Sequence, residues 1–293
     1  MSASIRPRRS VLYMPGSSSR ALEKARSLPV DGIIMDLEDA VAPQAKATAR
    51  DAVIAAITDG DYGSRELVIR INGLDTPWGH ADLAAAASCS AHAAVLLPKI
   101  DNAEQVRTCI RQLREAGATD ELRVWLMAET PSGILNISDI AAADPAVETI
   151  VMGTSDLAKA LRVPPDPQRT GLIHALSGCV IAARAHGLDI LDGVFADLAD
   201  DSGFRHACEQ GKTLGFDGKT LVHPRQIDAA NAVFGVSNDE LERAEAIVAA
   251  WTKAAERGQG IAVLDGQMIE QLHADAAQRT LALAAAIRNR NQE

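Results

Sequence analysis

Short apolar runs alternate with helix-length intervals along most of this chain, and this alternation constrains the fold more than any other feature. A short apolar run is typical of a parallel strand that is buried on both faces. The expected strands are residues 10–14, 32–36, 67–71, 94–98, 124–128, 149–153, 189–193 and 218–222. A first helix is expected after residue 16, with Ser18 or Ser19 as its N-cap. Further helices are expected at residues 44–57, 79–88, 103–116 and 171–187, and a last one begins at Gln226. Eight strand–helix units favour a closed (β/α)8 TIM barrel over an open sheet.

The end of the chain has no place in such a barrel, because the eighth unit ends near residue 235. Ser237 begins a Ser-x-x-Glu capping box, which predicts the start of an alanine-rich helix. A short apolar run then leads through an Asp-Gly pair into a second helix. We therefore expect a barrel domain over residues 1–235 and a helical extension over 236–293. The extension is expected to pack on the barrel or on a neighbouring subunit.

The net charge, the apolar runs and the cysteine spacing of the chain exclude several classes of binding partner and site. The chain has 293 residues and a formal net charge of −10, which argues against nucleic acid or an anionic membrane as the main partner. No apolar run approaches the ~20 residues that span a bilayer, and there is no signal-peptide core, so a cytoplasmic location is expected. The four cysteines are widely spaced, which predicts buried core residues rather than a zinc site or a redox pair.

Polar residues follow the expected strands on their C-terminal side, where the active site of a (β/α)8 barrel lies. They are Asp36, Glu38, Asp39, Arg70, Glu129, Asp156, Asp192 and His223, the last followed by Pro224. The strand interiors are almost wholly apolar, so we predict one polar site at this rim of the barrel. The alternative is that the strands end in polar residues only because loops begin there.

Glu129 and Asp156 follow the fifth and sixth expected strands, and parallel neighbours joined by a right-handed crossover end at the same edge. Two carboxylates with open positions suit Mg²⁺ or Mn²⁺, because such an ion also accepts waters and substrate oxygens. The ion could bind a 2-oxo acid through its keto and carboxylate oxygens and act as a Lewis acid. A structural ion pair is the alternative for either acid, although no lysine or arginine is adjacent in sequence.

Arg70 is the one charged residue within its expected strand, and a guanidinium there must be paired or must reach the rim. At the rim it could stabilise an enolate or alkoxide as negative charge develops. The alternative is a purely structural ion pair with Glu38 or Asp39. Together with Asp36, these two acids could instead hydrogen-bond metal-bound waters.

Two further groups of residues could bind the substrate. Gly153, Thr154 and Ser155 precede a helix whose backbone N–H groups suit a carboxylate, although a Ser or Thr cap explains the same residues. Three basic residues on the first expected helix could hold phosphates, or could form a solvated face; they are Arg20, Lys24 and Arg26. The chain has no Walker A sequence, no GxGxxG fingerprint and no GxSxG elbow.

Several blocks of this sequence resemble, in the same order, the citrate lyase β-subunit-like proteins and the malyl-CoA and citramalyl-CoA lyases. These families are grouped with the HpcH/HpaI aldolases. The blocks are RSVLYMPG, DLEDAVAP with Lys46 and Arg50 following, VIRING, LPK, AETPSG, MGTSDLA, GFDGKTLVHPRQI and DGQMIE. The resemblance covers nearly the whole chain and is specific because so many blocks occur together.

The resemblance implies a Mg²⁺-dependent lyase that cleaves a 3-hydroxyacyl-CoA thioester into acetyl-CoA and a 2-oxo acid. It implies metal ligands at Glu129 and Asp156 and an oxyanion contact from Arg70. It also implies a homotrimer or a dimer of trimers, in which a C-terminal acid from a DGxMID-like pattern protonates the enolate. That acid is Glu270 here, where the family commonly has aspartate, and Ser155 also differs from many relatives. His223 and Pro224 join the basic residues of the first helix as candidate contacts for coenzyme A.

The leading hypothesis is therefore a carbon–carbon lyase acting on malyl-CoA, citramalyl-CoA or a related thioester. Three alternatives stay open: a citrate lyase β subunit acting on citryl-acyl-carrier protein, a malyl-CoA thioesterase, and a non-catalytic acyl-CoA-binding subunit. Arg70, Glu129 and Asp156 argue against the last of these, because a subunit without catalysis has no need of them.

Overall fold

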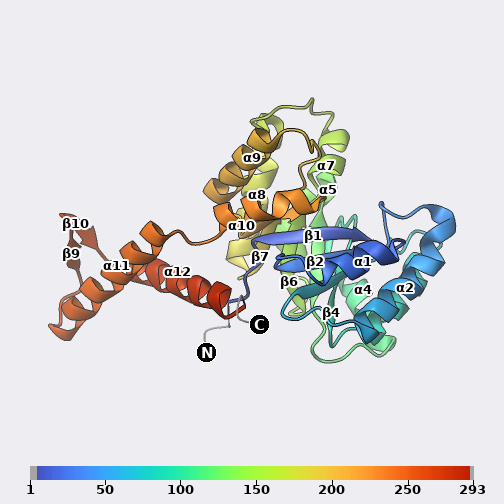
Figure 1. Ribbon diagram of the computed structural model, residues 1–293, viewed down its shortest axis with the longest axis horizontal. Helices are drawn as coiled ribbons and strands as arrows, with labels where there is room; N and C mark the ends of the chain where they lie inside the picture. The colour runs from blue at the N-terminus through green and yellow to red at the C-terminus, as the bar shows by residue number, and fades with distance from the viewer. Residues whose placement is uncertain (1–4, 291–293) are drawn as a thin grey trace. The chain divides into compact units, whose positions relative to one another are not determined.

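The computed structural model describes residues 5–290, in which eight parallel strands close into a barrel with helices around it (Figure 1). The strands are β1 (Ser10–Pro15), β2 (Gly32–Asp36), β3 (Glu66–Arg70), β4 (Ala93–Leu97), β5 (Val124–Ala128), β6 (Val147–Met152), β7 (Asp189–Asp192) and β8 (Gly218–Leu221). Each strand pairs with the next, and β8 pairs with β1. The expected (β/α)8 TIM barrel is confirmed.

Helices follow the strands in sequence. The α-helices of this part are α1 (Ser19–Ala25), α2 (Lys46–Asp59), α3 (Gly79–Ser88), α4 (Ala103–Glu115), α5 (Pro131–Leu135), α6 (Ile137–Ala141), α7 (Thr154–Leu161), α8 (Ile173–Ala185), α9 (Asp201–Leu214) and α10 (Ile227–Phe234). Short 3₁₀ helices η1 (Pro43–Ala45), η2 (Thr170–Leu172) and η3 (Pro224–Gln226) precede α2, α8 and α10. Ser18 caps α1 by accepting the Ala21 N–H, and Asn102 begins α4 with a complete capping box.

The barrel interior is filled by alternate residues of the strands, because successive side chains point to opposite faces. The interior cluster is Val11, Ile34, Val68, Ala94, Leu96, Trp125, Met127, Val151 and Leu191. The same register aligns Asp36 with Arg70, and Ala128 with Met152. Residues at and just after these positions therefore lie together at the C-terminal mouth of the barrel.

Several element boundaries differ from the expected ones. β3 is Glu66–Arg70 rather than 67–71, because Arg70 is the last residue that pairs with β2. The helix expected from residue 44 begins at Lys46, since Pro43 begins a separate 3₁₀ turn. The helix expected at 171–187 is η2 followed by α8, which ends before Gly187 in the left-handed conformation.

Arg8 closes the N-terminal end of the barrel, opposite the mouth. Its guanidinium bonds Glu66 at 2.7 Å and Asp189 at 2.5 Å, lies 2.9 Å from Glu148, and stacks 5.2 Å from the Trp125 ring centre. The Arg8 side chain is only 3% exposed. We refer to Arg8, Glu66, Glu148 and Asp189 as the barrel floor. It gives the buried Arg8 guanidinium three carboxylate partners, without which its charge would be buried and uncompensated.

The described residues form two compact units, Arg8–Asn231 on the one hand and residues 232–290 together with residues 5–7 on the other. In the second unit, α11 (Asn238–Glu256) packs against α12 (Gln271–Arg290) and against a hairpin of β9 (Ala262–Leu264) and β10 (Gln267–Ile269). The Ser237 capping box forms as expected, whereas the hairpin was not expected. A domain boundary after residue 235 stays a prediction.

The hairpin turns at Asp265 and Gly266, which both have positive φ, at 50° and 75°. An Asp-Gly pair suits such a two-residue turn, because both positions require the left-handed conformation.

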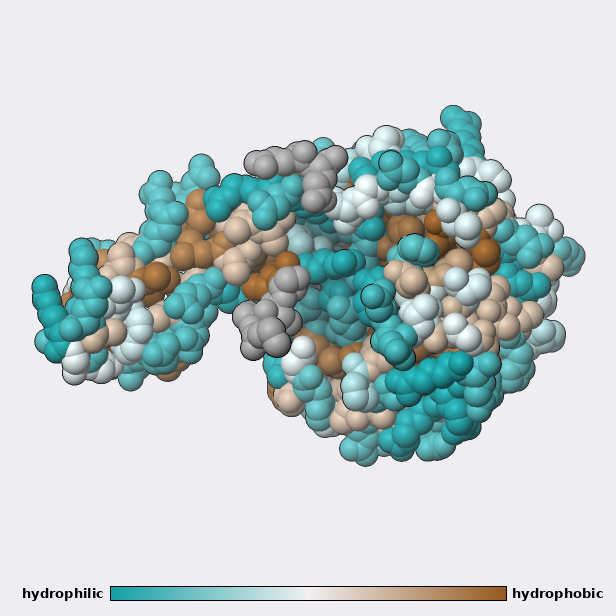
Figure 2. All heavy atoms as spheres, turned by 90° about the horizontal axis from the view of Figure 1, so that it is seen from below, coloured by the Kyte–Doolittle hydropathy of each residue, from teal (hydrophilic) through white to brown (hydrophobic). Residues whose placement is uncertain are grey.

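Several apolar side chains of this unit are exposed: Ile261, Val263, Met268 and Leu272. Figure 2 shows apolar surface on this unit from one side. Within residues 5–290, no helix has the length and apolar character needed to cross a bilayer.

Candidate active site

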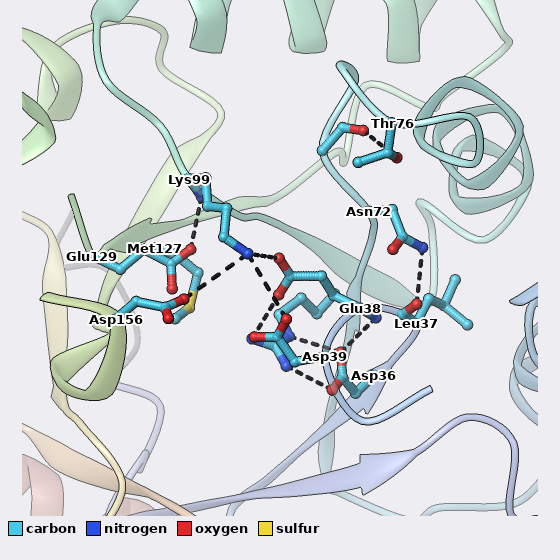
Figure 3. A network of polar contacts seen from close by, with 12 residues as sticks. Asp36, Leu37, Glu38, Asp39, Asn72, Thr76, Lys99, Met127, Glu129 and Asp156 are labelled. Atoms are coloured by element: carbon cyan, nitrogen blue, oxygen red, sulfur yellow. Dashed lines mark hydrogen bonds and ion pairs between the residues drawn. The ribbon is translucent and has the colours of Figure 1, made fainter. Parts of the chain in front are cut away.

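Acidic residues that follow β2, β5 and β6 meet at the mouth of the barrel (Figure 3). Glu129 directly follows β5 and is 3% exposed, and Asp156 lies in the first turn of α7 after β6, with its side chain 39% exposed. Glu38 and Asp39 lie in the loop after β2. The four carboxylates face the same central point in Figure 3, which brings together predicted residues that are far apart in sequence.

Arg70 is held by the acids that follow β2. Its Nε and one terminal nitrogen donate to the two carboxylate oxygens of Asp36 at 2.7 and 2.6 Å, while the other terminal nitrogen lies 2.9 Å from Glu38. The guanidinium also stacks 4.8 Å from the Tyr13 ring centre. Burial alone would lower the pKa of Arg70, but the bond to Asp36 and its other neighbours raise the pKa above its ordinary value.

The ion pair of Arg70 with Glu38, which was the alternative interpretation of Arg70, is therefore present, and Asp39 lies farther away at 3.8 Å. Asp36, which was expected only as a partner of metal-bound waters, is the bidentate partner. The reason is register, because Asp36 and Arg70 are directly aligned across β2 and β3. The pair fixes the plane of the guanidinium at the mouth.

Lys99 is a site residue that the sequence reasoning missed. It follows β4, and its backbone N–H donates to Glu129 at 2.8 Å. Its side-chain nitrogen bonds Glu38 and lies 3.8 Å from Asp39 and 3.9 Å from Asp156. The absence of a basic residue beside the acids in sequence was misleading, because the fold supplies one. The signal was a lysine directly after the Leu-Pro end of an expected strand.

Glu129 has the strongest electrostatic perturbation among these acids. Burial and the nearby Glu38 carboxylate raise its pKa to about 7, although the Lys99 N–H, Arg70 and the Lys99 ammonium act in the opposite direction. Burial likewise raises the pKa of Glu38, against the opposing influence of Arg70 and Lys99. A carboxylate that costs energy to ionise gains most when a cation is placed beside it.

Lys46 fixes the loop that carries Glu38. Its ammonium donates to the carbonyls of Leu37 and Glu38 at 2.9 and 2.8 Å, and to the Asn72 side chain at 2.7 Å. It also lies 5.2 Å from the Trp78 ring centre. These contacts join the loop after β2 to the loop after β3. Lys46 therefore holds in place the backbone that carries Glu38.

The residues present fit a divalent cation. Glu129 and Asp156 supply hard oxygen donors. Gly153 leaves space for the Glu129 side chain, because a Cβ at position 153 would lie 2.3 Å from the Glu129 Cβ and 2.6 Å from its Oε2. Among residues 5–290, no three His, Cys, Asp or Glu side chains form a closed ligand group. Mg²⁺ is typically bound by one or two protein carboxylates, while water and substrate oxygens fill its other coordination positions.

The need for glycine at position 153 can be tested directly. We expect Gly153→Ala to lower Mn²⁺ affinity by about tenfold or more, because the added methyl group must displace Glu129, and overpacking costs about 1–3 kcal/mol of stability. The measurement is Mn²⁺ binding by electron paramagnetic resonance together with thermal unfolding. Gly178→Ala on α8 is the matched control, since a Cβ there meets no atom within 4 Å. Wild-type Mn²⁺ affinity in Gly153→Ala would contradict the expectation.

The residues expected to bind a substrate carboxylate begin α7. Gly153 is the N-cap residue, and no side chain caps the helix, so the alternative of a simple Ser or Thr cap is wrong. Thr154 is buried and Ser155 is exposed. The helix N-terminus thus keeps free backbone donors beside Asp156, and its role in carboxylate binding stays a prediction.

The candidate coenzyme A residues divide into two groups. Arg20 and Lys24 are exposed on α1, whereas Arg26 at its C-terminus pairs with Glu23 at 3.1 Å and stacks on Tyr62. His223 is the N-cap residue of η3, and its Nδ1 accepts the Arg225 N–H at 3.2 Å. Pro224 is the first residue of η3. His223 and Pro224 therefore already have a local structural role.

Asp192 does not join the polar site, which corrects the prediction. Leu191 points into the barrel, so Asp192 points to the outer face of β7. There it is fully buried and bonds Lys219 at 2.7 Å and Arg169 at 2.7 and 2.9 Å. Burial would raise the pKa of Asp192, but the two cations outweigh it and hold that pKa below its usual range.

Glu270 belongs to the second unit, where it directly precedes α12 and its N–H donates to His273 Nδ1 at 3.1 Å. Its catalytic role stays a prediction.

The four cysteines are buried and unpaired, as expected, and burial raises the pKa of Cys109 to about 11. A pocket of about 670 Å³ opens beside Lys99, lined by the loop after β3, the loop after β4 and the start of α4.

Several known proteins are similar to this chain over most of its length. A (3S)-malyl-CoA thioesterase of Cereibacter sphaeroides is 48% identical over 96% of both chains. An L-malyl-CoA/beta-methylmalyl-CoA lyase of the same species is 34% identical, over 90% of this chain and 91% of its own. CitE of Mycobacterium tuberculosis, solved with magnesium, acetoacetate and coenzyme A, has a TM-score of 0.74 at 28% identity over 94% of this chain and 97% of its own. The HpcH/HpaI aldolase/citrate lyase family model matches residues 9–224, and the chain belongs to that family.

Proposed function

We propose that this protein is a Mg²⁺-dependent enzyme that cleaves a 3-hydroxyacyl-CoA thioester of the malyl-CoA class at a carbon–carbon bond. The observation that carries the proposal is the mouth of the barrel, where Lys99 contacts Glu129 and Asp156 (Figure 3). Lys99 also bonds Glu38, and the same Glu38 carboxylate pairs with the Arg70 guanidinium. Carboxylates suit a cation that binds a 2-oxo acid, and a guanidinium suits an enolate. The malyl-CoA lyase at 34% identity supports this reaction.

In the proposed reaction, a base removes the proton of the 3-hydroxyl group, and the adjacent carbon–carbon bond breaks. The bonding electron pair moves onto the thioester, which becomes an enolate beside Arg70. Glu270 then donates a proton to the enolate carbon to give the acyl-CoA product, and the former hydroxyl carbon remains as the 2-oxo acid. Mg²⁺ held by Glu129 and Asp156 would supply a Lewis acid for the oxygens of the 2-oxo acid.

Hydrolysis is the second candidate, and the thioesterase at 48% identity over 96% of both chains favours it. Water would add to the thioester carbonyl, and the carbon–sulfur bond would break to release the free acid and the thiol of coenzyme A. The same two carboxylates and Arg70 would bind the acyl part of the substrate. The two reactions therefore differ in products rather than in the residues that hold the substrate.

The experiment incubates the full chain and Mg²⁺ with malyl-CoA, citramalyl-CoA and β-methylmalyl-CoA. Acyl-CoA with glyoxylate or pyruvate, without free thiol, identifies the lyase. Free thiol with the intact hydroxy acid identifies the thioesterase. A parallel reaction with EDTA should lose either activity. No turnover of any of the three thioesters would refute the proposed function.

Glu270→Ala separates the two reactions further. We expect the variant to lose carbon–carbon cleavage by at least about 100-fold, because general acid catalysis contributes about 10²–10⁴-fold, while Mn²⁺ affinity stays unchanged. Glu245→Ala, an exposed glutamate of α11, is the control for loss of a carboxylate from the same unit. Unchanged cleavage by Glu270→Ala would remove this residue from the mechanism.

We also propose that the protein assembles as a homotrimer or a dimer of trimers. Support comes from the exposed apolar side chains of the second unit, which include Val263 at 70% and Leu272 at 62% exposure. Exposed apolar surface of this kind commonly marks an interface. Light scattering after gel filtration measures the assembly, and a monomer at micromolar concentration would contradict it.

A further inference from the structure

Lys99 contacts the acids of the mouth through two different groups. Its backbone N–H binds Glu129 at 2.8 Å, while its ammonium group binds Glu38 and lies 3.8 Å from Asp39. The ammonium also lies 3.9 Å from Asp156 (Figure 3). One residue therefore contacts both acids to which the metal site is assigned and both acids of the loop after β2.

The backbone of Lys99 is fixed in an uncommon conformation. Its φ is 52°, in the left-handed region that non-glycine residues seldom adopt, and Pro98 precedes it. Such a conformation persists where the surroundings impose it, and it occurs often at functional sites. In this conformation the Lys99 N–H points toward Glu129, which follows β5, while the side chain extends toward Glu38 and Asp39. The side chain is 48% exposed, so its ammonium can move while its N–H stays on Glu129.

The position of the ammonium conflicts with a divalent cation. A cation bound by Glu129 and Asp156 would lie beside the Lys99 nitrogen, because that nitrogen is within 4 Å of Asp156. Two positive groups this close repel each other, and both attract the same carboxylate. The bond to Glu38 and the neighbouring Asp39 give the ammonium partners that it can keep when it leaves Asp156.

We propose that Lys99 is a positioning residue that competes with the divalent cation for Asp156 and thereby limits the metal affinity of the site. The inference rests on the metal site of the proposed function. It adds that the fold itself carries a competing cation. Lys99 balances the acids when no metal is bound, and it gives up Asp156 when the metal binds.

The test measures Mn²⁺ binding to the full chain by electron paramagnetic resonance, with Mg²⁺ as competitor. The variants are Lys99→Met, which removes the charge, and Lys99→Arg, which keeps it. Arg205→Met is the matched control, since Arg205 is an exposed residue of α9 that pairs with Glu209 on its own helix. We expect Lys99→Met to bind Mn²⁺ about tenfold more tightly than wild type. Lys99→Arg and Arg205→Met should stay within about twofold of wild type.

Thermal unfolding supplies a second measurement. In EDTA we expect Lys99→Met to unfold at a lower temperature than wild type, because the acids then repel one another with less compensation. Saturating Mg²⁺ should raise its unfolding temperature by more than it raises that of wild type. A lysine with only a structural role would lower the unfolding temperature equally with and without Mg²⁺.

The outcomes separate the two proposals. Wild type that binds Mn²⁺, with tighter binding by Lys99→Met, supports both the metal site and the competition. Wild type that binds Mn²⁺, with equal or weaker binding by Lys99→Met, overturns the competition and leaves the metal site standing. Wild type that binds no Mn²⁺ overturns both.

Discussion

Arg70→Lys is expected to lower kcat/KM for the thioester substrate by about 10²–10³-fold, the range found when one donor to a developing oxyanion is removed. Lysine keeps the positive charge, but it cannot bind both oxygens of Asp36 and also face Glu38 as the planar guanidinium does. The loss should fall mainly on kcat, because the enolate forms only during the reaction. Steady-state kinetics with the substrate found in the product assay give the measurement.

Two controls accompany this variant. Arg50→Lys makes the same chemical change at a partly buried ion pair with Asp82 on the helix α3, and it should keep at least half of the wild-type kcat/KM. Mn²⁺ affinity of Arg70→Lys should stay within a few-fold of wild type, which shows that the acids remain in place. If Arg70→Lys turns over at the wild-type rate, Arg70 has only a structural role at the mouth.

Asp192→Asn is expected to have the largest effect on stability, a loss of about 3–5 kcal/mol in the free energy of unfolding. Removing one partner of a buried ion pair leaves the other charge uncompensated, and here both Lys219 and Arg169 lose their carboxylate. Lys219 is 1% exposed, so water cannot replace the lost partner. Urea unfolding followed by circular dichroism measures the change. Glu209→Gln, which breaks only the exposed pair with Arg205, should cost less than about 1 kcal/mol.

The pH dependence of this effect follows from the lowered pKa of Asp192. A carboxyl whose folded pKa lies below its unfolded value of about 3.9 contributes stability above that value, and the contribution is lost as the pH falls through the folded pKa. The difference between wild type and Asp192→Asn should therefore be complete at pH 7 and should shrink below about pH 4. A difference that stays constant down to pH 3 would show that Asp192 acts through packing rather than charge.

The barrel could be predicted from the sequence because its signal is local. Most of the strands are apolar runs, and β2 and β5 have the expected bounds. Boundaries were wrong where a local rule acts over one or two residues, as at Pro43, or where pairing with a neighbouring strand decides the end, as at Arg70. The β9–β10 hairpin was missed because its strands are too short to show a period of two.

The site was predictable only in part, for a different reason. Position along the chain indicated which residues end strands, so Arg70 and Glu129 could be placed at the mouth. It could not indicate which side of a strand Asp192 faces, because one residue of register moves a side chain from the interior to the outer face. Nor could it reveal that Lys99 lies among acids that follow three other strands, β2, β5 and β6. Such contacts depend on the closure of the barrel, which no short stretch of sequence encodes.

The barrel floor has a consequence for how the chain is made. Arg8 is synthesised before its partners, which lie 58 and 181 positions later in the chain, at Glu66 and Asp189. Until β7 has been synthesised, this arginine lacks one of its carboxylates, and a partial barrel holds an incompletely compensated charge at its base. Early fragments are thus kept from settling into a closed structure, since contacts so distant in sequence form slowly and late. The barrel floor is complete only after the start of β7 has been added to the chain.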